Sequence, residues 1–327
     1  MTNEHSTSLL SVKRRYPELA KNGANLLAQC SYMDLIWRLS KSKYVTYAAL
    51  KGGQSLNAWE QRYYRCSNGL DIQLLCENRN VQPKELLWAI TNNDSASLFG
   101  IKYELNDHRM KSVRNGYTGY NKFKVRAILG CTIVNLTVTV WNSPLETFWA
   151  DYLPYPSMIK LDEPVSVLVT KKEAMLADKL SLLIEFGCEN RNLKHYYDIS
   201  FIARSYSIDR RNLVEALWLA LCQRQSMGYL MRPDCYWEPS FSLTFAQKES
   251  SKNIWHKFRN SQPLDPEIPQ HFSSVIEETK AFAIPLFKQV KELYHYKFPY
   301  YEKAPALDSS LNVMPPPLDG PEHHSPM

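Results

Sequence analysis

The sequence predicts an α/β fold in which a mixed sheet comes first and a domain made of helices follows. Between about residues 69 and 140, short runs alternate apolar and polar side chains, which is the period of a half-buried strand. From about Thr170 the apolar residues recur at helical spacing instead. At 327 residues, with 44% hydrophobic residues, the chain can form about two domains with real cores.

The first half of the chain has elements of both kinds. In its clearest strand the apolar side chains Leu70 and Ile72 face one side, and Asp71 faces the other with its polar neighbours. The expected elements are, in order, a helix over 8–40, an apolar run over 44–50 that ends at a glycine turn, the strand over 69–74, a helix that begins near Pro83, and strands over 122–128 and 135–140.

Helical periodicity dominates the second half. We expect helices within the segments 171–186, 210–225 and 272–294. From Ala304 the sequence holds six prolines and no apolar periodicity, which predicts a disordered tail. The predicted organisation is a helical lead-in over 1–42, an α/β domain over 43–165, a helical domain over 166–300, and the proline-rich tail over 301–327.

Composition excludes several classes of protein. No stretch reaches the ~18 consecutive apolar residues of a membrane helix, and the first residues lack the pattern of a secretory signal. We therefore expect a cytoplasmic protein. The net charge of +6 permits an anionic partner. The cysteines are odd in number, scattered and never paired as CxxC, which favours free thiols in a reducing compartment: they are Cys30, Cys66, Cys76, Cys131, Cys188, Cys222 and Cys235.

A pair of glycines, Gly52 and Gly53, follows the first apolar run. Glycines at such a position let backbone N–H groups approach a phosphate closely. The alternative is an ordinary turn between a strand and a helix. The neighbouring side chains Lys51 and Ser55 belong to the same candidate phosphate site.

Asp71 is the candidate metal ligand of the strand that follows. Nucleotidyl transfer needs carboxylates that hold Mg²⁺ against a triphosphate, because the metal ion neutralises charge on the leaving group. An isolated strand aspartate can also serve only to keep an edge strand soluble. Arg65, just before this strand, can act as a phosphate-binding fork or as a solvated edge charge.

Three charged residues stand out in the helical half. Lys179 lies on or beside the apolar face of its helix, so its ammonium either reaches water or points between the domains toward a phosphate. Lys194 and Asp198 are four residues apart on one helical turn, which allows a plain surface ion pair.

Residues 102–126 form a basic stretch interleaved with aromatic side chains. Cations on phosphates and rings under unstacked bases suit a single-stranded RNA end. A solvated loop and hairpin explains the same composition. The RNA-binding candidates are Arg109, Lys111, Arg114, Lys122 and Lys124.

Several segments together resemble a known family. In order they are KGGQSL (51–56), RCSNGLD (65–71), EAMLADKL (173–180), RNLKHYYDI (191–199) and NIWHKF (253–258). They resemble the AbiEii/AbiGii family of nucleotidyltransferase toxins. With the final amphipathic helix, the resemblance spans roughly residues 44–292.

The resemblance implies a nucleotidyltransferase fold with two lobes and a nucleoside triphosphate (NTP) in the cleft between them. It implies transfer of a nucleotide to an RNA acceptor, in some relatives the 3′ end of tRNA, in a toxin–antitoxin or phage-defence (abortive-infection) setting with an antitoxin partner. It assigns Mg²⁺ to Asp71 and catalysis to Asp71, Lys179 and Asp198, with Asp198 positioning Lys194 or a substrate hydroxyl. The implied nucleotide-binding residues are Lys51, Gly52, Gly53, Ser55, Arg65, Ser67 and Lys194.

The sequence departs from the family pattern where charge matters. Gly69 replaces the first acid of the Asp71 strand, and Thr137 stands where an acid on a neighbouring strand is expected. His195 replaces the acid that follows the lysine of the RNLKHYYDI segment. These changes motivate a second hypothesis, in which the fold is a nucleotide-, RNA- or partner-binding module with little or no transfer activity.

Overall fold

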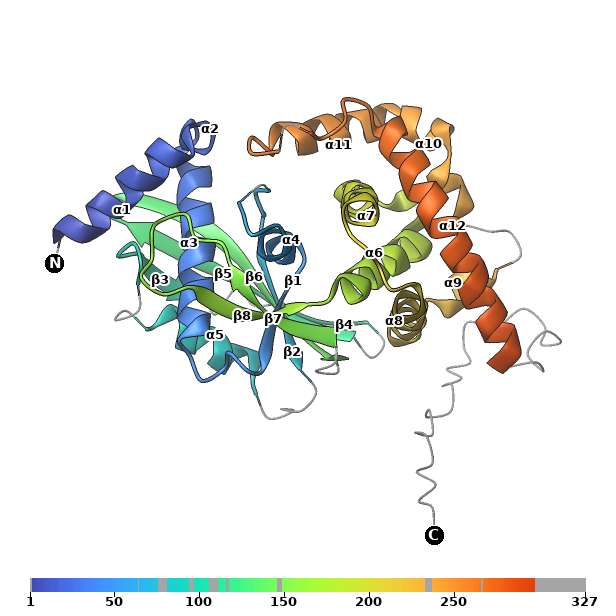
Figure 1. Ribbon diagram of the computed structural model, residues 1–327, viewed down its shortest axis with the longest axis horizontal. Coiled ribbons are helices and arrows are strands. Elements are labelled where there is room, and N and C mark those ends of the chain that lie inside the picture. The colour runs from blue at the N-terminus through green and yellow to red at the C-terminus, as the bar shows by residue number, and fades with distance from the viewer. Residues whose placement is uncertain are drawn as a thin grey trace, which may run out of the picture.

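The computed structural model describes residues 2–63, 65–75, 81–93, 97–105, 111–115, 118–145, 149–232, 237–265 and 267–297. We call Thr2–Thr170 the sheet lobe and Lys171–Lys297 the helical lobe, and Figure 1 shows them side by side. The predicted disordered tail over 301–327 lies outside the described residues, as do Cys76, Arg109 and Cys235.

The described part of the sheet lobe holds one eight-stranded sheet with the order β3-β5-β6-β2-β1-β8-β7, and β4 pairs with β5 beside this path. The pairs β2–β6 and β1–β8 are parallel, and the others are antiparallel. The strands are β1 (Ala48–Lys51), β2 (Leu70–Leu75), β3 (Lys102–Leu105), β4 (Lys111–Asn115), β5 (Thr118–Leu129), β6 (Thr132–Leu145), β7 (Ala150–Tyr155) and β8 (Val165–Thr170).

Helices cover one face of this sheet. Leu70 and Ile72 of β2 are buried in a core with Val138 of β6, as their alternation predicts. The predicted helix over 8–40 is divided into three, because Pro17 begins a new helix and the Asn22 side chain caps the next one at Ala24 and Asn25. The helices are α1 (Thr2–Arg15), α2 (Pro17–Ala20), α3 (Gly23–Ser40), α4 (Gly53–Glu60) and α5 (Pro83–Thr91).

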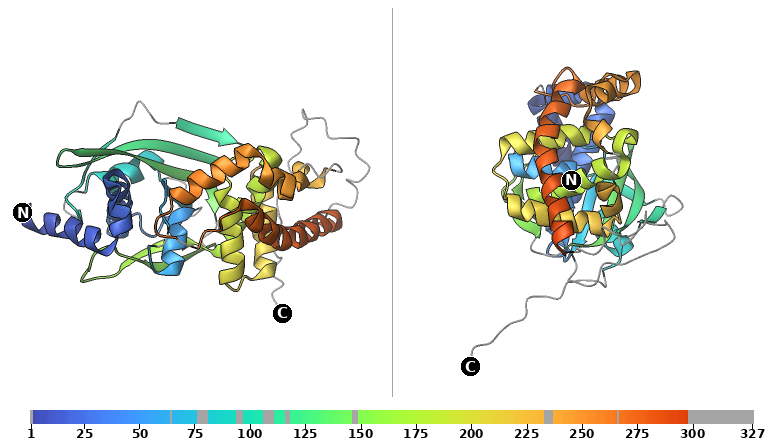
Figure 2. Two further views of the ribbon diagram at one scale, coloured as in Figure 1. Left: turned by 90° about the horizontal axis from the view of Figure 1, so that it is seen from above. Right: turned by 90° about the vertical axis from the view of Figure 1, so that its right-hand side faces the viewer.

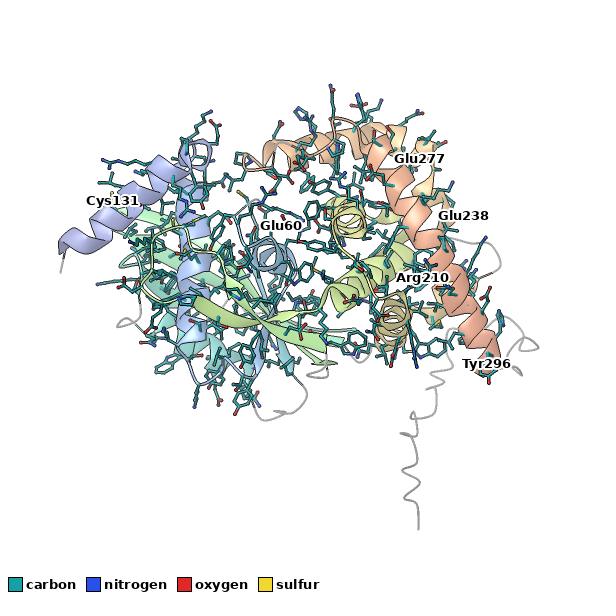
Figure 3. The ribbon with its side chains drawn as sticks, viewed as in Figure 1. Glu60, Cys131, Arg210, Glu238, Glu277 and Tyr296 are labelled. Atoms are coloured by element: carbon teal, nitrogen blue, oxygen red, sulfur yellow. The ribbon has the colours of Figure 1, made fainter. Side chains whose placement is uncertain are left out.

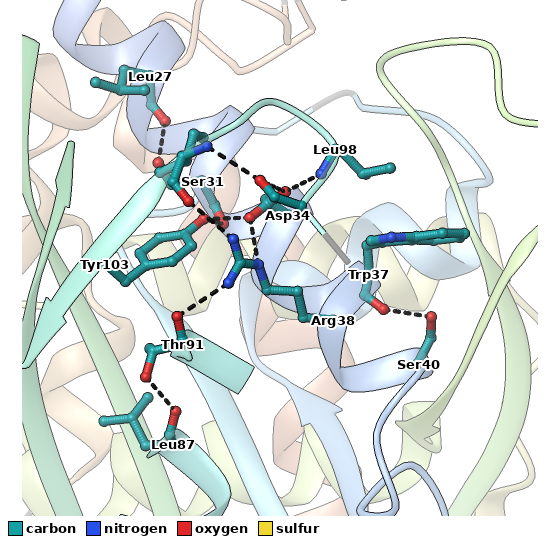
Figure 4. A network of polar contacts seen from close by, with 12 residues as sticks. Leu27, Ser31, Asp34, Trp37, Arg38, Ser40, Leu87, Thr91, Leu98 and Tyr103 are labelled. Carbon is teal, nitrogen blue, oxygen red and sulfur yellow. Dashed lines mark hydrogen bonds and ion pairs between the residues drawn. The ribbon is translucent and has the colours of Figure 1, made fainter. Parts of the chain in front are cut away.

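A buried ion pair fixes α3 to the rest of the sheet lobe (Figure 4). Arg38 Nε donates to Asp34 at 2.8 Å, and the other guanidinium nitrogens donate to the carbonyl oxygens of Thr91 and Ile101. The Asp34 carboxylate also accepts a hydrogen bond from the hydroxyl of Tyr103 at 2.9 Å. Both charged groups therefore have full sets of partners inside the core.

The helical lobe has a core of its own. Aromatic rings gather there, including Tyr196, Phe241 and Phe272. In the right-hand panel of Figure 2, α12 crosses the front of this lobe. Its elements are α6 (Lys172–Phe186), η5 (Gly187–Glu189), α7 (Lys194–Ser205), α8 (Arg210–Gln223), α9 (Met227–Met231), η6 (Glu238–Phe241), α10 (Leu243–Gln247), α11 (Glu249–Asn260) and α12 (Phe272–Lys297).

The predicted fold class is confirmed, since a mixed α/β sheet is followed by packed helices. Strands β7 and β8, which complete the sheet beside β1, were not predicted. Among the described residues, no helix combines the length and apolar character that crossing a membrane requires. The cysteines in the described part of the chain are free thiols, among them Cys131 at the β5–β6 hairpin, which Figure 3 labels.

Candidate active site at the junction of the two lobes

The glycine turn lies directly against Asp71. Gly52 has φ +68°, and a Cβ atom there would lie 2.9 Å from Asp71 Oδ2, so this position accepts only glycine without strain. A Cβ atom on Gly53 would lie 3.0 Å from Ser67 Oγ. The Gln29 side chain of α3 in turn donates to the Ser67 carbonyl and accepts from its N–H, at 2.9 and 3.2 Å. The turn, the loop before β2 and the carboxylate thus form one compact unit.

Contacts between the lobes surround this unit. The N–H of Cys66 donates to Gln262 Oε1 at 2.9 Å, which ties the loop before β2 to the segment after α11. Glu60 lies at the end of α4 where the lobes meet, as labelled in Figure 3. Its carboxylate accepts a hydrogen bond from the hydroxyl of Tyr206, which follows α7. The helical lobe is therefore held against the glycine turn from two sides.

A buried charge cluster joins the two lobes. Asp198 of α7 is 1% exposed, and its carboxylate contacts both the Arg65 guanidinium and the Lys179 ammonium, the latter at 2.7 Å. Arg65 and Lys179 are 4% and 6% exposed, so neither is a solvated charge. The guanidinium also lies over the Phe258 ring, 5.4 Å from its centroid. Two buried cations thus share one carboxylate.

The pKa values of two lysines at this junction are both lowered. Burial lowers the pKa of Lys179 well below its ordinary value, and the charges of Arg65 and Lys194 lower it further. Burial and Arg65 also lower the pKa of Lys194, while the Asp71 carboxylate acts in the opposite direction. Burial and neighbouring cations thus lower the pKa of both lysines, and a bound anion would act in the opposite direction.

A second ion network lies beside the first. Lys51 at the end of β1 is 3.4 Å from Asp178 of α6, and its ammonium lies 4.4 Å from the centroid of the Trp141 ring. Arg224 contacts Asp178 at 2.6 Å and Glu185 at 3.4 Å. Burial acts to raise the pKa of Asp178, but Lys51 and Arg224 together hold it below its usual range. Lys51 is thus held by an aspartate of the other lobe.

Comparison with known proteins identifies the family. A family model described as the nucleotidyl transferase AbiEii toxin of type IV toxin–antitoxin systems matches residues 34–282. The chain belongs to this AbiEii toxin family. The match includes the glycine turn, Asp71 and the buried cluster around Asp198. The resemblance carried by the five short segments is therefore confirmed.

Solved structures of related description resemble the chain at low identity. MenT4, a nucleotidyltransferase toxin from Mycobacterium tuberculosis, matches with 16% identity and a TM-score of 0.47, over 86% of this chain and 98% of that one. JHP933 from Helicobacter pylori matches with 14% identity and a TM-score of 0.45, over 84% and 97%. A putative nucleotidyltransferase from H. pylori matches with 16% identity and a TM-score of 0.40, over 80% and 95%. No curated protein matches the sequence.

Two of the residues that the AbiEii resemblance suggested have unexpected partners. Ser55 is fully buried, and its hydroxyl donates to the Leu50 carbonyl at 3.0 Å, so it stabilises the turn from within. Asp198 pairs with Lys179 and Arg65 rather than with Lys194. The helical spacing of Lys194 and Asp198 could not reveal this, because it describes only one helix.

The RNA-binding candidates that the structure describes lie on β4 and β5, and the Asp71 face of the sheet carries two of them. Register places Asp71 beside Thr139, and Thr139 opposite Lys122, which is exposed. Lys124 follows on the same face and donates a hydrogen bond to the Thr137 hydroxyl at 2.7 Å. Lys111 and Arg114 belong to β4, which pairs with β5.

Asp71 is the candidate ligand for a divalent ion. Among the described residues, no group of three His, Cys, Asp or Glu side chains is arranged to hold a metal ion. Asp71 is half-buried and makes no ion pair with any side chain in the described ranges. Mg²⁺ can be held by one carboxylate together with phosphate oxygens of a substrate. The residues thus fit one ion shared with a triphosphate.

The sequence did not indicate several other residues of the site. Tyr32 of α3 is buried near Asp71, and burial raises the pKa of its hydroxyl to about 12. His195, which the sequence singled out only as a departure from the family pattern, is the second residue of α7, and its Nδ1 atom is buried without a hydrogen-bond partner among the described residues. Gln262 and Asp178 complete the set, and only Asp178, as the neighbour of Lys179, could have been found from a motif.

Proposed function

We propose that this chain transfers a nucleotide from an NTP to an RNA acceptor, and that it acts as a toxin restrained by an antitoxin partner. The observation that supports this most is the contact of the Gly52–Gly53 turn with Asp71, beside the buried cation Lys179 and the half-buried cation Lys194. Such a site offers backbone N–H groups, a metal-binding carboxylate and excess positive charge to one triphosphate.

Each residue has a separate role in this proposal. The backbone N–H groups of Gly52 and Gly53 approach the phosphates, since neither residue has a side chain in the way. Lys179 neutralises phosphate charge, and Asp198 is a positioning residue that holds its ammonium at 2.7 Å. Mg²⁺ bound by Asp71 and the triphosphate would neutralise charge on the leaving pyrophosphate.

The proposed reaction is a single displacement. The oxygen of an acceptor hydroxyl attacks the α-phosphorus, and the bond from that phosphorus to the bridging oxygen of the β-phosphate breaks. Pyrophosphate leaves, and the hydroxyl proton passes to solvent. Catalysis of this kind depends on positioning and charge stabilisation, so removal of a cation should lower the rate directly.

The face of the sheet around Asp71 supports an RNA acceptor. Lys122 and Lys124 follow each other on this face of β5. Tyr120 of the same strand packs against Trp141 of β6 with ring centroids 4.8 Å apart. Cations and aromatic rings on one surface suit an unpaired nucleic-acid strand, because phosphates meet the cations and bases stack on rings.

The test is incubation of the purified chain with total cellular RNA, Mg²⁺ and each labelled NTP in turn. We expect label in a discrete RNA band, lost in Asp71→Ala and in Lys179→Ala. Asp162→Ala is the matched control, because Asp162 is exposed and lies outside the site, so its activity should equal that of the wild type.

Two outcomes would reject the proposal. Absence of label with every NTP would leave the second hypothesis, a binding module with an enzyme's fold. Equal labelling by wild type and by both site variants would assign the activity to a contaminant.

A further inference from the structure

At Gly69, where the family pattern has its first acid, the neighbouring strand β6 leaves little room for a side chain. A Cβ atom at Gly69 would lie 3.3 Å from the carbonyl oxygen of Thr137 and 3.9 Å from its Cβ. The Gly69 carbonyl also accepts a hydrogen bond from Ser67 Oγ at 2.6 Å. The start of β2 is therefore packed tightly against β6, and position 69 contributes no side-chain ligand to the site.

At Thr137, where the family pattern has a second acid, the ammonium group of a lysine lies against the side chain. The Thr137 hydroxyl accepts a hydrogen bond from the Lys124 ammonium at 2.7 Å. Thr137 and Lys124 are paired across the β5–β6 ladder. On the same face of the sheet, the next set of paired residues along the strands contains Asp71 and Thr139. An ammonium group thus lies where the family pattern has a carboxylate, which reverses the sign of the charge there.

Further cations reach Asp71 from other elements. Lys51 is directly opposite Asp71 across the β1–β2 pair. The Asp71 carboxylate also raises the pKa of Lys194 of α7 and Lys179 of α6, so both lie near it from the helical lobe. In the described ranges, no group of three His, Cys, Asp or Glu side chains is arranged to hold a metal ion. Asp178 and Asp198 already pair with Lys51 and Lys179. A second divalent ion would therefore share Asp71 and meet the Lys124 ammonium, which is electrostatically unfavourable.

We propose that this site binds a triphosphate with one divalent ion only, and that Lys124 takes the electrostatic role of a second metal ion. The inference rests on the triphosphate binding in the proposed function. Mg²⁺ requires oxygen ligands in octahedral geometry, and Asp71 with phosphate oxygens supplies enough for one ion. Lysine binds phosphate as a point charge and needs no such cage.

Metal stoichiometry tests the inference without any transfer reaction. The probe is inorganic triphosphate with Mn²⁺, and electron paramagnetic resonance counts the Mn²⁺ ions bound per chain. We expect one Mn²⁺ in the wild type in the presence of triphosphate. Two Mn²⁺ ions per chain, or no triphosphate binding with or without Mn²⁺, would overturn the inference.

A variant tests the role of Lys124. Triphosphate affinity measured by calorimetry in the presence of a chelator should fall about tenfold in Lys124→Ala. Lys160→Ala is the matched control, because Lys160 is exposed and lies outside the site, and its affinity should change less than about twofold. Equal affinities in both variants would contradict the inference.

Different experimental results would reject the inference and the proposed function. RNA labelling together with two bound Mn²⁺ ions would reject the inference and leave the proposed function intact. One bound Mn²⁺ with lysine-dependent triphosphate binding but no RNA labelling would support the inference and reject the transfer reaction.

Discussion

Two buried ion clusters in this chain differ in how their charges balance. In the sheet lobe, Asp34 and Arg38 pair one to one with both side chains 0% exposed, and backbone carbonyls take the other N–H groups of the guanidinium (Figure 4). At the junction of the lobes, Asp198 alone faces Arg65 and Lys179. The first cluster is neutral and complete, and the second has one buried positive charge in excess.

The difference distinguishes a structural cluster from a candidate site. A buried ion pair whose hydrogen bonds are all made has its donors and acceptors already in use, so it does not bind a ligand. Two buried cations that share one carboxylate are costly, since burial and the neighbouring Arg65 lower the pKa of Lys179, and a phosphate group would reduce that cost. We therefore expect the two clusters to respond to mutation in opposite ways.

Arg38→Ala should have the largest effect on stability. It leaves the Asp34 carboxylate buried without its cation, which should lower the free energy of unfolding by about 3–5 kcal/mol. Urea denaturation at pH 7 measures the change. Arg126→Ala is the control, because its pair with Glu104 is exposed and should cost less than about 1 kcal/mol. A similar small loss in Arg38→Ala would show that the buried network does not stabilise the fold.

Lys179→Met should lower activity and leave stability nearly unchanged. The variant removes one of two cations that share Asp198, so the free energy of unfolding should stay within about 1 kcal/mol of the wild type. Nucleotide transfer to RNA should fall about 10²–10³-fold. The labelling assay and urea denaturation are run on the same preparation. A stability loss as large as that of Arg38→Ala would make this cluster structural too.

Gly52→Ala should perturb the site through the backbone. Gly52 has φ +68° and lies against Asp71, so an alanine should cost about 1–3 kcal/mol and displace the carboxylate. Gly130→Ala is the matched control, since Gly130 has φ +59° and no atom within 4 Å of an added Cβ. Both variants should lose stability in urea, but only Gly52→Ala should bind triphosphate more weakly. Equal binding would exclude the turn from the phosphate site.

His195→Gln should have the smallest effect on stability at pH 7. The effect should appear only when stability is compared at different pH values. Burial and the charges of Lys179 and Lys194 lower the pKa of His195 well below its ordinary value. Between the folded and unfolded pKa values the unfolded chain binds more protons, so stability is lost as the pH falls below about 6.5.

Urea titrations at pH 7 and pH 5 measure this difference. We expect the wild type to lose more stability than His195→Gln over this range, by up to about 1.4 kcal/mol for each pH unit below 6.5. Identical losses in the two proteins would show that the histidine titrates alike in the folded and unfolded chains.

Much of the fold could be predicted from local patterns. Alternation identified the buried face of β2, and helical periodicity identified α6, α8 and α12. Five short segments were enough to identify the AbiEii family. The strands β7 and β8 were missed for different reasons. β8 is a short, mostly apolar run, which does not distinguish a strand from a buried helix segment, and β7 contains a proline and lacks regular alternation.

The pairing of charges could not be predicted. Lys194 and Asp198 share a helical turn, but Asp198 pairs with Lys179 of α6 and Arg65 of the other lobe. Likewise, nothing in the sequence near Lys124 indicates that its ammonium would lie on Thr137 across the β5–β6 pair. Each of these contacts requires strands or helices to be placed against one another first.

The sequence by itself determined the period of β2 and of the helices α6, α8 and α12, the turn at the two glycines and the family. These properties depend on backbone preferences and apolar spacing that act over a few neighbouring residues. The tertiary structure alone decided which cations share Asp198 and which cation replaces a missing acid. The physical reason is that electrostatic interactions depend on distance and burial in space, and the chain order of the residues fixes neither.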